Sequence, residues 1–430
     1  MSKILVAFYL ENKSFSDIDC TDVNQGNPGI GGTEYMIWFI CSMLSRKYDD
    51  LHVCMFANNI QFLPEQLDKI QVENEIGAIE EAEKIGADIL VLRSPYLADE
   101  TFIRLEKSNL KVVAWSHNYE KYPWVDKLAA CKSIKRNICV GREQYERLRD
   151  HNLFQKSDYI YNTIQFQLYE NNSEKIPNSV CYIGSLHKSK GFHRLAKIWS
   201  KVEKTIPGAE LYVIGSGRLY NKSQSMGQYG LAEESYENRF IKYFLKEDGS
   251  IRENIHFMGV MGGHEKIDFM KKMQVGVVSP TGVDETFCIG AVEFEAMGIP
   301  VVSIRKYALF DTVLNNETGF LFKSDKEFAD DIIKILQHDS LGMELGNAGK
   351  DFVRQNFAPD DVLNKWHKIL LEVYHDELSK PDYTIHNLGN NKKWLRELNR
   401  MVRHLFPRMP SIIWYENIPH EMAEMVRRLK

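Results

Sequence analysis

Two acids, Glu285 and Glu293, form the strongest candidate for chemistry in this sequence. The apolar pattern that follows Cys288 predicts a helix, with Glu285 just before it and Glu293 about one turn inside it. Because helical side chains lean towards the N-terminus of their helix, both carboxylates can converge on one ligand held there. Carboxylates accept hydrogen bonds from hydroxyl groups, so the pair predicts a polyol ligand. The alternative is that both acids only complement the helix dipole.

The backbone between these acids predicts a phosphate contact. The amides of Phe287, Cys288 and Ile289 lie at the start of the expected helix, where N–H groups lack partners and the helix dipole favours an anion. Carboxylates for hydroxyl groups beside amides for phosphates are what a nucleotide sugar requires. This combination makes a nucleotide-sugar site the leading hypothesis.

Two further side chains stand where such a ligand would be bound. Lys190 lies in the segment from Gly184 to Gly191, which follows an expected strand and opens a helix, so its ammonium can meet a phosphate. The alternative is an exposed lysine at a helix start. His117 follows the expected strand at residues 111–115 and stands at its carboxyl end, the ligand side of open parallel sheets. The alternative is a histidine with a structural role only.

The N-terminal loop Asn27-Pro-Gly-Ile-Gly-Gly-Thr-Glu34 is rich in glycine. It lacks the third glycine of a dinucleotide fingerprint and lies too far after the first expected strand, which argues against NAD binding. Gly31 and Gly32 allow the backbone to approach a cleft, whereas Glu34 is equally well explained as a helix-start acid. The pair Asp17 and Asp19 resembles a metal-diphosphate motif, but its polar surroundings favour a solvated loop, and no metal is expected.

Short apolar runs alternate with helical patterns along most of the chain. This alternation predicts an α/β protein with two Rossmann-like, doubly wound parallel-sheet domains that face a central cleft. The polar stretch 169–177 predicts the connection between them. The expected units are an acceptor-side domain (1–173), a nucleotide-sugar-binding domain (174–358) and C-terminal helices (359–430) that return to the N-terminal domain.

Composition excludes several other classes of protein. Lys and Arg number 54 against 59 Asp and Glu, a net charge of −5, which argues against a nucleic-acid partner. The 7 cysteines are scattered without CxxC spacing, which favours a reducing compartment over a disulfide scaffold or zinc site. No secretory signal is visible, and the longest apolar run, residues 35–44, is about half of what a membrane-spanning helix needs. We therefore expect a cytoplasmic protein.

Residues 391–405 form a basic amphipathic helix pattern. Two interpretations stay open: the segment lies on an anionic membrane surface, or its apolar stripe packs on the N-terminal domain while the cations face water. The stripe contains Trp394, Leu398, Met401, Val402 and Leu405, and the cations around it are Lys392, Lys393, Arg396, Arg400 and Arg403.

Taken in order, these motifs resemble a known family. The spacing from Glu285 to Glu293 matches the E-x7-E element of retaining glycosyltransferases of family 4, which have the GT-B fold. The resemblance extends over most of the chain through Gly31-Gly-Thr-Glu34, Asn162, the segment from Gly184 to Gly191, Val213-Ile-Gly-Ser-Gly217, Phe257-Met-Gly259 and Gly298-Ile-Pro-Val-Val302.

The resemblance implies a role for each candidate residue. Glu285 would contact donor-sugar hydroxyls and Glu293 the nucleotide ribose, while Lys190 and the 287–289 amides would meet the diphosphate. His117 would lie near the transferred sugar, and Gly31, Gly32, Ser185 and Gly215 would lie beside the donor. Ser185 departs from the family, in which many members carry an arginine here; Lys188, His187 or Arg218 then supplies the charge, or donor binding is weaker. Cys288 departs from the commoner glycine.

The function implied is a retaining, metal-independent hexosyltransferase with no cofactor beyond its donor substrate. It would move a hexosyl unit from a nucleotide-diphosphate sugar to a glycan or glycolipid acceptor in surface polysaccharide or glycoconjugate synthesis. Its location would be the cytoplasm, at the inner face of the membrane if residues 391–405 bind there. The alternatives are a nucleotide-sugar epimerase or hydrolase of the same fold, and a non-catalytic sugar-nucleotide-binding scaffold.

Overall fold

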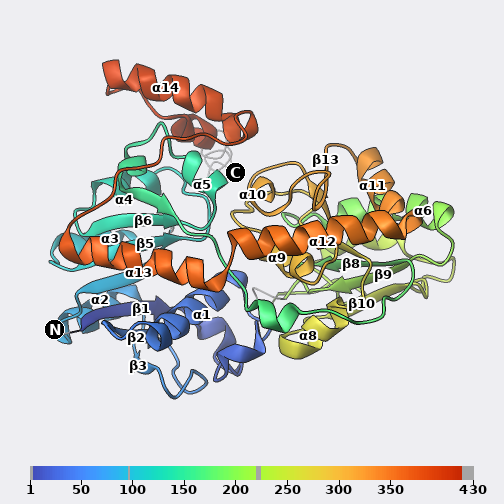
Figure 1. The fold of residues 1–430 in the computed structure, drawn as a ribbon, viewed down its shortest axis with the longest axis horizontal. Helices are drawn as coiled ribbons and strands as arrows, with labels where there is room; N and C mark the ends of the chain where they lie inside the picture. Colours follow the sequence, from blue (N-terminus) through green and yellow to red (C-terminus); the bar gives the residue numbers. More distant parts are fainter. Residues whose placement is uncertain (1–2, 95–96, 219–223, 419–430) are drawn as a thin grey trace.

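The computed structural model describes residues 3–94, 97–218 and 224–418. It contains two parallel β-sheets of 7 and 6 strands, and helices cover both faces of each (Figure 1). This arrangement confirms the predicted fold class, two Rossmann-like domains of the GT-B type.

The N-terminal sheet has the strand order β3-β2-β1-β4-β5-β6-β7, and all neighbouring strands are parallel. Its central strands are almost continuously apolar because helices bury both faces. The strands are β1 (Ile4–Leu10), β2 (Leu51–Ala57), β3 (Asp68–Gln71), β4 (Ile89–Ser94), β5 (Lys111–Ser116), β6 (Ile134–Cys139) and β7 (Ser157–Tyr159). The helices are α1 (Gly32–Lys47), α2 (Glu75–Lys84), α3 (Asp99–Glu106), α4 (Trp124–Ala130) and α5 (Arg142–Glu146).

The C-terminal sheet has the order β10-β9-β8-β11-β12-β13, again with parallel neighbours only. The strand order reverses between β8 and β11, which is where open parallel sheets bind ligands. The strands are β8 (Ser179–Ile183), β9 (Glu210–Ile214), β10 (Ile255–Gly259), β11 (Val275–Val278), β12 (Val301–Ile304) and β13 (Gly319–Phe322). The helices are α6 (Phe192–Thr205), α7 (Glu234–Phe240), α8 (Gly263–Met270), α9 (Ile289–Ala296), α10 (Leu309–Thr312), α11 (Asp325–Gln337) and α12 (Asp339–Asn356).

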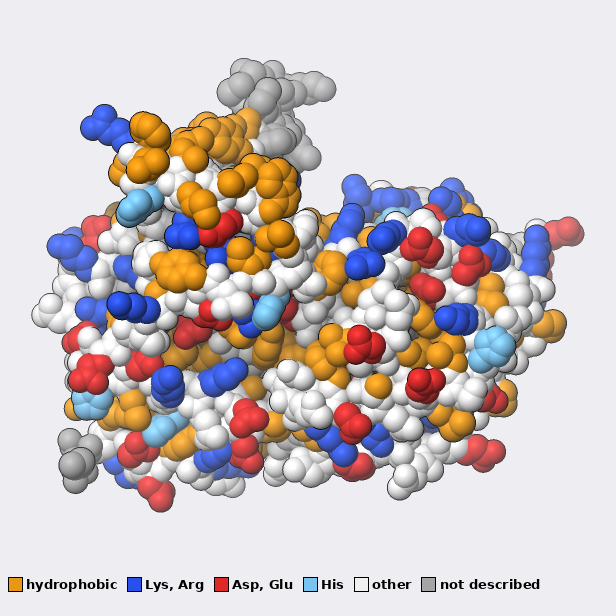
Figure 2. Space-filling model, turned by 45° about the horizontal axis from the view of Figure 1, so that its top comes forward, with side chains coloured by type: hydrophobic (Ala, Val, Ile, Leu, Met, Phe, Trp, Pro, Cys, Tyr) orange, Lys and Arg blue, Asp and Glu red, His pale blue; other side chains and the backbone are white. Residues whose placement is uncertain are grey.

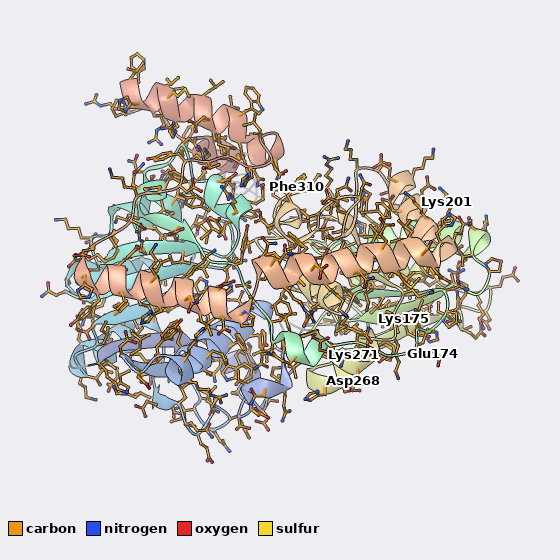
Figure 3. The ribbon with its side chains drawn as sticks, in the orientation of Figure 1. Glu174, Lys175, Lys201, Asp268, Lys271 and Phe310 are labelled. Atoms are coloured by element: carbon orange, nitrogen blue, oxygen red, sulfur yellow. The ribbon has the colours of Figure 1, made fainter. Side chains whose placement is uncertain are left out.

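The connection between the sheets runs past α8. Lys175 Nζ donates to the Lys271 carbonyl at 2.9 Å, and both residues are labelled close together in Figure 3. Asn171 Nδ2 donates to the same carbonyl at 3.0 Å and to the Met297 carbonyl at 3.1 Å. These bonds tie the polar stretch to the C-terminal domain and direct Tyr169, at the end of the short 3-10 helix Phe166–Tyr169, towards the cleft.

The chain then returns to the N-terminal domain. Helix α13 (Pro359–His375) follows α12 and lies along the N-terminal sheet (Figure 1). Trp366 of α13 is fully buried, with its ring centroid 6.0 Å from that of Phe8 and 4.5 Å from that of Trp115. Burial of a large aromatic side chain anchors this helix to the N-terminal core.

Helix α14 (Lys393–Leu405) presents its apolar stripe to solvent, contrary to the interpretation in which this stripe packs on the N-terminal domain. Its apolar stripe does not pack on the N-terminal domain: Leu398 is 50% exposed, whereas Lys393 and Arg396 are fully buried. The expected inward stripe is therefore wrong, because carboxylates such as Glu143 and Asp150 pair with the buried cations. Within residues 3–94, 97–218 and 224–418, no helix is long and apolar enough to cross a membrane.

Candidate functional site

A cavity lies between the two domains, where loops from both sheets meet. Its N-terminal wall contains His117 and several residues of the glycine-rich loop before α1, namely Asn27, Gly29, Ile30, Gly32 and Thr33. Its C-terminal wall contains residues from the loops after β8, β9 and β11. The domains touch beside it: Thr286 Oγ1 donates to the His117 carbonyl at 2.7 Å, and Tyr119 Oη donates to the Glu285 carbonyl at 3.2 Å. The cleft predicted between two facing sheets is therefore present and narrow.

Lys190 and Glu285 face each other across this cavity. Lys190 Nζ lies 2.8 Å from Glu285 Oε2, and Glu285 is 8% exposed. The preceding residue, Asp284, has φ +59°, a left-handed conformation that turns the loop and directs Glu285 into the cleft. The arrangement offers a cation for a phosphate and a carboxylate for a sugar hydroxyl at one place.

Glu293 forms a second, more deeply buried pair. Its Oε1 accepts from Lys266 Nζ at 2.7 Å and from Tyr169 Oη at 2.8 Å. Lys266 belongs to α8, and both Lys266 and Glu293 line the cavity. Burial and the Glu293 carboxylate raise the pKa of the Tyr169 hydroxyl well above its ordinary value, so Tyr169 is a hydrogen-bond donor here. Glu293 is thus held rigidly, with one oxygen occupied twice.

The start of α9 points its amides into the same cavity. The Ile289 N–H already donates to the Phe287 carbonyl at 3.0 Å, so it is not available for the predicted phosphate contact in this geometry. The amides of Phe287, Cys288 and Gly290 have no acceptor among the described residues. The predicted amide set therefore shifts by one residue, with Gly290 replacing Ile289. Burial raises the pKa of the Cys288 thiol well above its ordinary value, so it is not a nucleophile.

Four buried polar side-chain atoms in this cavity lack a partner in the described part of the chain. They are His117 Nε2, Asn162 Oδ1, Ser185 Oγ and Ser279 Oγ. A buried polar group without a partner costs about 1–3 kcal/mol, so four in one cavity indicate a polar ligand or solvent that completes them. Burial and the nearby Arg93 hold the pKa of His117 well below its ordinary value, which makes the imidazole neutral.

The structure brings nearly all of the predicted site residues together. His117, Ser185, Lys190, Gly215, Glu285, Phe287, Cys288, Ile289, Glu293 and Gly32 line the cavity, whereas Gly31 does not. Gly31 is instead the residue that caps α1, and its carbonyl accepts from the Tyr35 amide at 2.9 Å. Gly215 has φ +144°, and a Cβ there would lie 2.0 Å from the Gly184 carbonyl oxygen, so only glycine fits.

The second cation of the cavity is Lys266, which the sequence analysis did not identify. None of the three residues expected to compensate for Ser185, namely His187, Lys188 and Arg218, lines the cavity. The signal that could have found Lys266 is its position in the first turn of a helix that follows a glycine pair, Gly262-Gly263. Tyr169, Asn162 and Ser279 were also absent from the predicted set.

The acidic pair near the N-terminus lies elsewhere. Neither Asp17 nor Asp19 lines the cavity, and Asp19 accepts from the Thr21 amide at 2.8 Å on an exposed loop. In the described ranges, no group of three or more His, Cys, Asp and Glu side chains could hold a metal ion. Glu34 pairs with Arg93 at 2.7 Å outside the cavity.

Curated relatives match about half of this chain. One is the capsular polysaccharide biosynthesis glycosyltransferase CapM of Staphylococcus aureus, 27% identical over 209 residues, which are 46% of this chain and 49% of CapM. Another is a trehalose synthase of Pyrococcus horikoshii, 23% identical over 188 residues, which are 42% of this chain and 40% of the synthase. The chain therefore aligns with half or less of the length of these relatives.

Solved structures match over most of the chain. Sucrose-phosphate synthase of Thermosynechococcus elongatus aligns with a TM-score of 0.67 at 16% identity, over 87% of this chain and 100% of that one. HepE of Anabaena, solved with UDP, aligns with a TM-score of 0.62 at 12% identity, over 86% of this chain and 100% of HepE. At such identities the likeness establishes the fold.

A family model matches residues 164–352, which include most of the candidate site. It spans the loops after β8, β9 and β11 and the whole of α9, and so includes Lys190, Lys266, Glu285 and Glu293. The chain has the GT-B fold, and its residues 164–352 match the family model described as glycosyl transferases group 1.

Proposed function

We propose that this protein is a retaining glycosyltransferase that moves a hexosyl unit from a nucleotide-diphosphate sugar to a glycan or glycolipid acceptor. The observation that carries the proposal is the convergence of two lysine–glutamate pairs and four unpartnered polar atoms on one cavity between the domains. The match of residues 164–352 to group 1 glycosyl transferases supports it. The relative CapM is a capsular polysaccharide biosynthesis glycosyltransferase, which supports a place in polysaccharide synthesis. HepE has been solved with UDP and with UDP-glucose, which supports a nucleotide-sugar donor.

The two lysine–glutamate pairs, Lys190–Glu285 and Lys266–Glu293, bind different parts of the donor. Lys190 and the Cys288 and Gly290 amides face the diphosphate, where the positive end of α9 adds to their attraction. Glu285 accepts from hydroxyls of the hexosyl unit. Glu293 accepts from the ribose through the oxygen that Lys266 and Tyr169 leave open.

The transfer breaks one bond and forms one. The acceptor hydroxyl oxygen attacks the anomeric carbon on the face that the diphosphate leaves, and the bond from that carbon to the phosphate oxygen breaks. The departing diphosphate takes the hydroxyl proton. Because the acceptor attacks on the face that the leaving group departs from, the anomeric configuration is retained. Lys190 and the amides stabilise the charge that develops on the leaving group, the role in which fixed donors contribute most.

His117 acts on the sugar rather than on the phosphates. The neutral imidazole of His117 has an unpartnered Nε2 that faces the cavity and can hydrogen-bond a sugar hydroxyl without adding charge. Positive charge comes from Lys190, Lys266 and the amides, so the proposed mechanism is independent of a metal. Activity in the presence of EDTA tests that part.

The test is a donor assay with UDP-glucose as the first probe and other nucleotide sugars after it. UDP release that depends on an added glycan or glycolipid acceptor supports transfer, and release without acceptor supports a hydrolase instead. Isomerised donor without release supports an epimerase. Glu285→Gln should lower kcat at least about a hundredfold, whereas Glu247→Gln, at an exposed position in the same domain, should not.

Besides hydrolysis or isomerisation of the donor, two further outcomes refute the proposal. The first is a product with inverted anomeric configuration by NMR, which contradicts retention. The second is a protein that binds donor but neither transfers nor hydrolyses it, which makes the chain a binding scaffold.

We infer a cytoplasmic location from the seven free cysteines, all of them buried; cell fractionation tests this. Contact with a membrane surface concerns a different face of the molecule, that of α14.

A further inference from the structure

Helix α14 presents a row of large apolar side chains to solvent. The exposed fractions are 51% for Trp394, 50% for Leu398, 54% for Met401, 73% for Leu405 and 65% for Phe406. Figure 2 shows these hydrophobic side chains gathered over the end of the N-terminal domain. An apolar face of this size, rimmed by polar residues, marks an interaction site rather than ordinary surface.

This orientation is fixed by buried ion pairs on the opposite side of the helix. Lys393 Nζ lies 2.6 Å from Glu146 Oε2 and also pairs with Glu143. Arg396 Nη2 lies 2.7 Å from Glu416 Oε1. All of these side chains except Glu416 are fully buried. Turning the helix to bury its apolar stripe would expose Lys393 and Arg396 to water and leave the buried carboxylates of the N-terminal domain without these partners, which is strongly destabilising.

The neighbouring residue Asp150 holds the helix at its middle. Its Oδ2 accepts from Asn399 Nδ2 at 2.9 Å and from the Ile412 amide at 2.5 Å. Asp150 also faces Arg396 at 3.5 Å, and its carbonyl accepts from Arg403. The polar face is therefore bonded to the N-terminal domain, and the apolar face stays exposed to solvent.

The charges around the apolar face are positive. Of the six Lys and Arg in residues 391–418, Lys393 and Arg396 are buried on the opposite side of the helix, which leaves four cations against two acids. The two acids, Glu397 and Glu416, are both engaged in ion pairs with arginine. Exposed side chains beside the stripe include Lys392, His404 and Arg408. A second copy of the chain docked by a two-fold axis would bring these cations together, whereas an anionic surface complements them.

We propose that α14 docks this protein on a lipid bilayer that contains anionic lipid, with the row from Trp394 to Phe406 inserted and the rim cations at the headgroups. Helices with Trp, Phe and Leu on one face and cations beside it lie in the plane of the interface in this way. Lys393 and Arg396 do not reach the lipid; they hold the helix in place. The proposal is independent of the proposed function, because it concerns a surface outside the cavity.

The test is flotation with vesicles of phosphatidylcholine alone or mixed with phosphatidylglycerol. The wild-type chain should float with the mixed vesicles and bind those without phosphatidylglycerol at least about fivefold more weakly. The variant L398E/M401E should lose at least about tenfold in partitioning. Met343→Glu is the matched control, since Met343 is 63% exposed on α12 of the other domain, and it should float like the wild type.

A second measurement reports on insertion directly. Brominated lipid should quench the fluorescence of the wild type, and Trp394→Phe should remove that quenching. Wild-type flotation equal to that of L398E/M401E overturns the proposal, as does equal binding to both kinds of vesicle. A wild-type dimer by light scattering that L398E/M401E makes monomeric, without vesicle binding, assigns the face to a second copy instead and also overturns it. Unchanged thermal unfolding of L398E/M401E shows that a loss is not due to misfolding.

Discussion

Replacing Lys266 by methionine should destabilise the C-terminal domain by about 3 kcal/mol. The Lys266 side chain is 8% exposed and that of Glu293 4%, and their charged atoms are 2.7 Å apart. Removal of one partner from a buried pair costs about 3–5 kcal/mol, because the other charge is left unpaired. Tyr169, which still donates to Glu293 at 2.8 Å, moves the expected value to the lower end. Methionine keeps most of the apolar stem, so lost packing adds little.

A double-mutant cycle separates the ion pair from the packing. Equilibrium urea denaturation of Lys266→Met, Glu293→Gln and the double variant should give a coupling energy of about 2 kcal/mol, with the double variant more stable than the sum of the singles predicts. Lys271→Met is the control on the same helix: Lys271 pairs with Asp268, which is 64% exposed, so its loss should cost under about 1 kcal/mol. Additive single changes, or a Lys266→Met variant within 1 kcal/mol of wild type, would falsify the assignment of a buried pair.

Two further changes test the contact between the domains. A Cβ at Gly141 would lie 2.3 Å from the Thr286 carbonyl oxygen, so Gly141→Ala must push the loop that holds Glu285 away by about 1 Å. We expect kcat/KM to fall about a hundredfold in Gly141→Ala and to stay unchanged in the control Gly342→Ala. A Gly141→Ala variant with wild-type activity would contradict the closed arrangement of the domains. Burial raises the pKa of Glu143 to about 7 and that of Asp311 well above its usual range. The native state then binds protons that the unfolded state has lost, so the free energy of unfolding should fall as pH rises from about 4.5 to about 7. This fall should be less steep in Asp311→Asn. Equal slopes for the wild type and Asp311→Asn would refute the raised pKa of Asp311.

The parts of the site that are close in sequence were predictable. Glu285 and Glu293 are eight positions apart, and α9, which begins between them, is apolar enough to be recognised as buried. Glu285 just before the helix and Glu293 about one turn inside it therefore lie at the same helix end. The same local logic succeeded for Lys190 and His117, each of which follows a strand of a parallel sheet.

The parts that depend on distant contacts were not predictable. Lys266 and Tyr169 reach Glu293 from 27 and 124 residues away, and each looks like an ordinary surface or core residue in its own segment. The bond of the Ile289 amide was not predictable for a local reason, because a tight turn that no pattern specifies directs this amide to the Phe287 carbonyl. Ser279 becomes recognisable only once burial leaves its hydroxyl without a partner among the described residues, and the same holds for the orientation of Asn162 towards the cavity.

The orientation of α14 shows where apolar periodicity misleads. Full burial of a large apolar side chain stabilises a fold by about 1.5–3 kcal/mol, so five that are half or more exposed forgo about 4–9 kcal/mol in water. That loss is outweighed because Glu143, Glu146 and Asp150 form an acidic row that matches the row of Lys393 and Arg396. Both rows have helical spacing and were visible in the sequence, but charge pairing across 250 residues is a tertiary property. On the proposed bilayer, the row from Trp394 to Phe406 would regain this free energy, so vesicle binding should raise the stability of the chain.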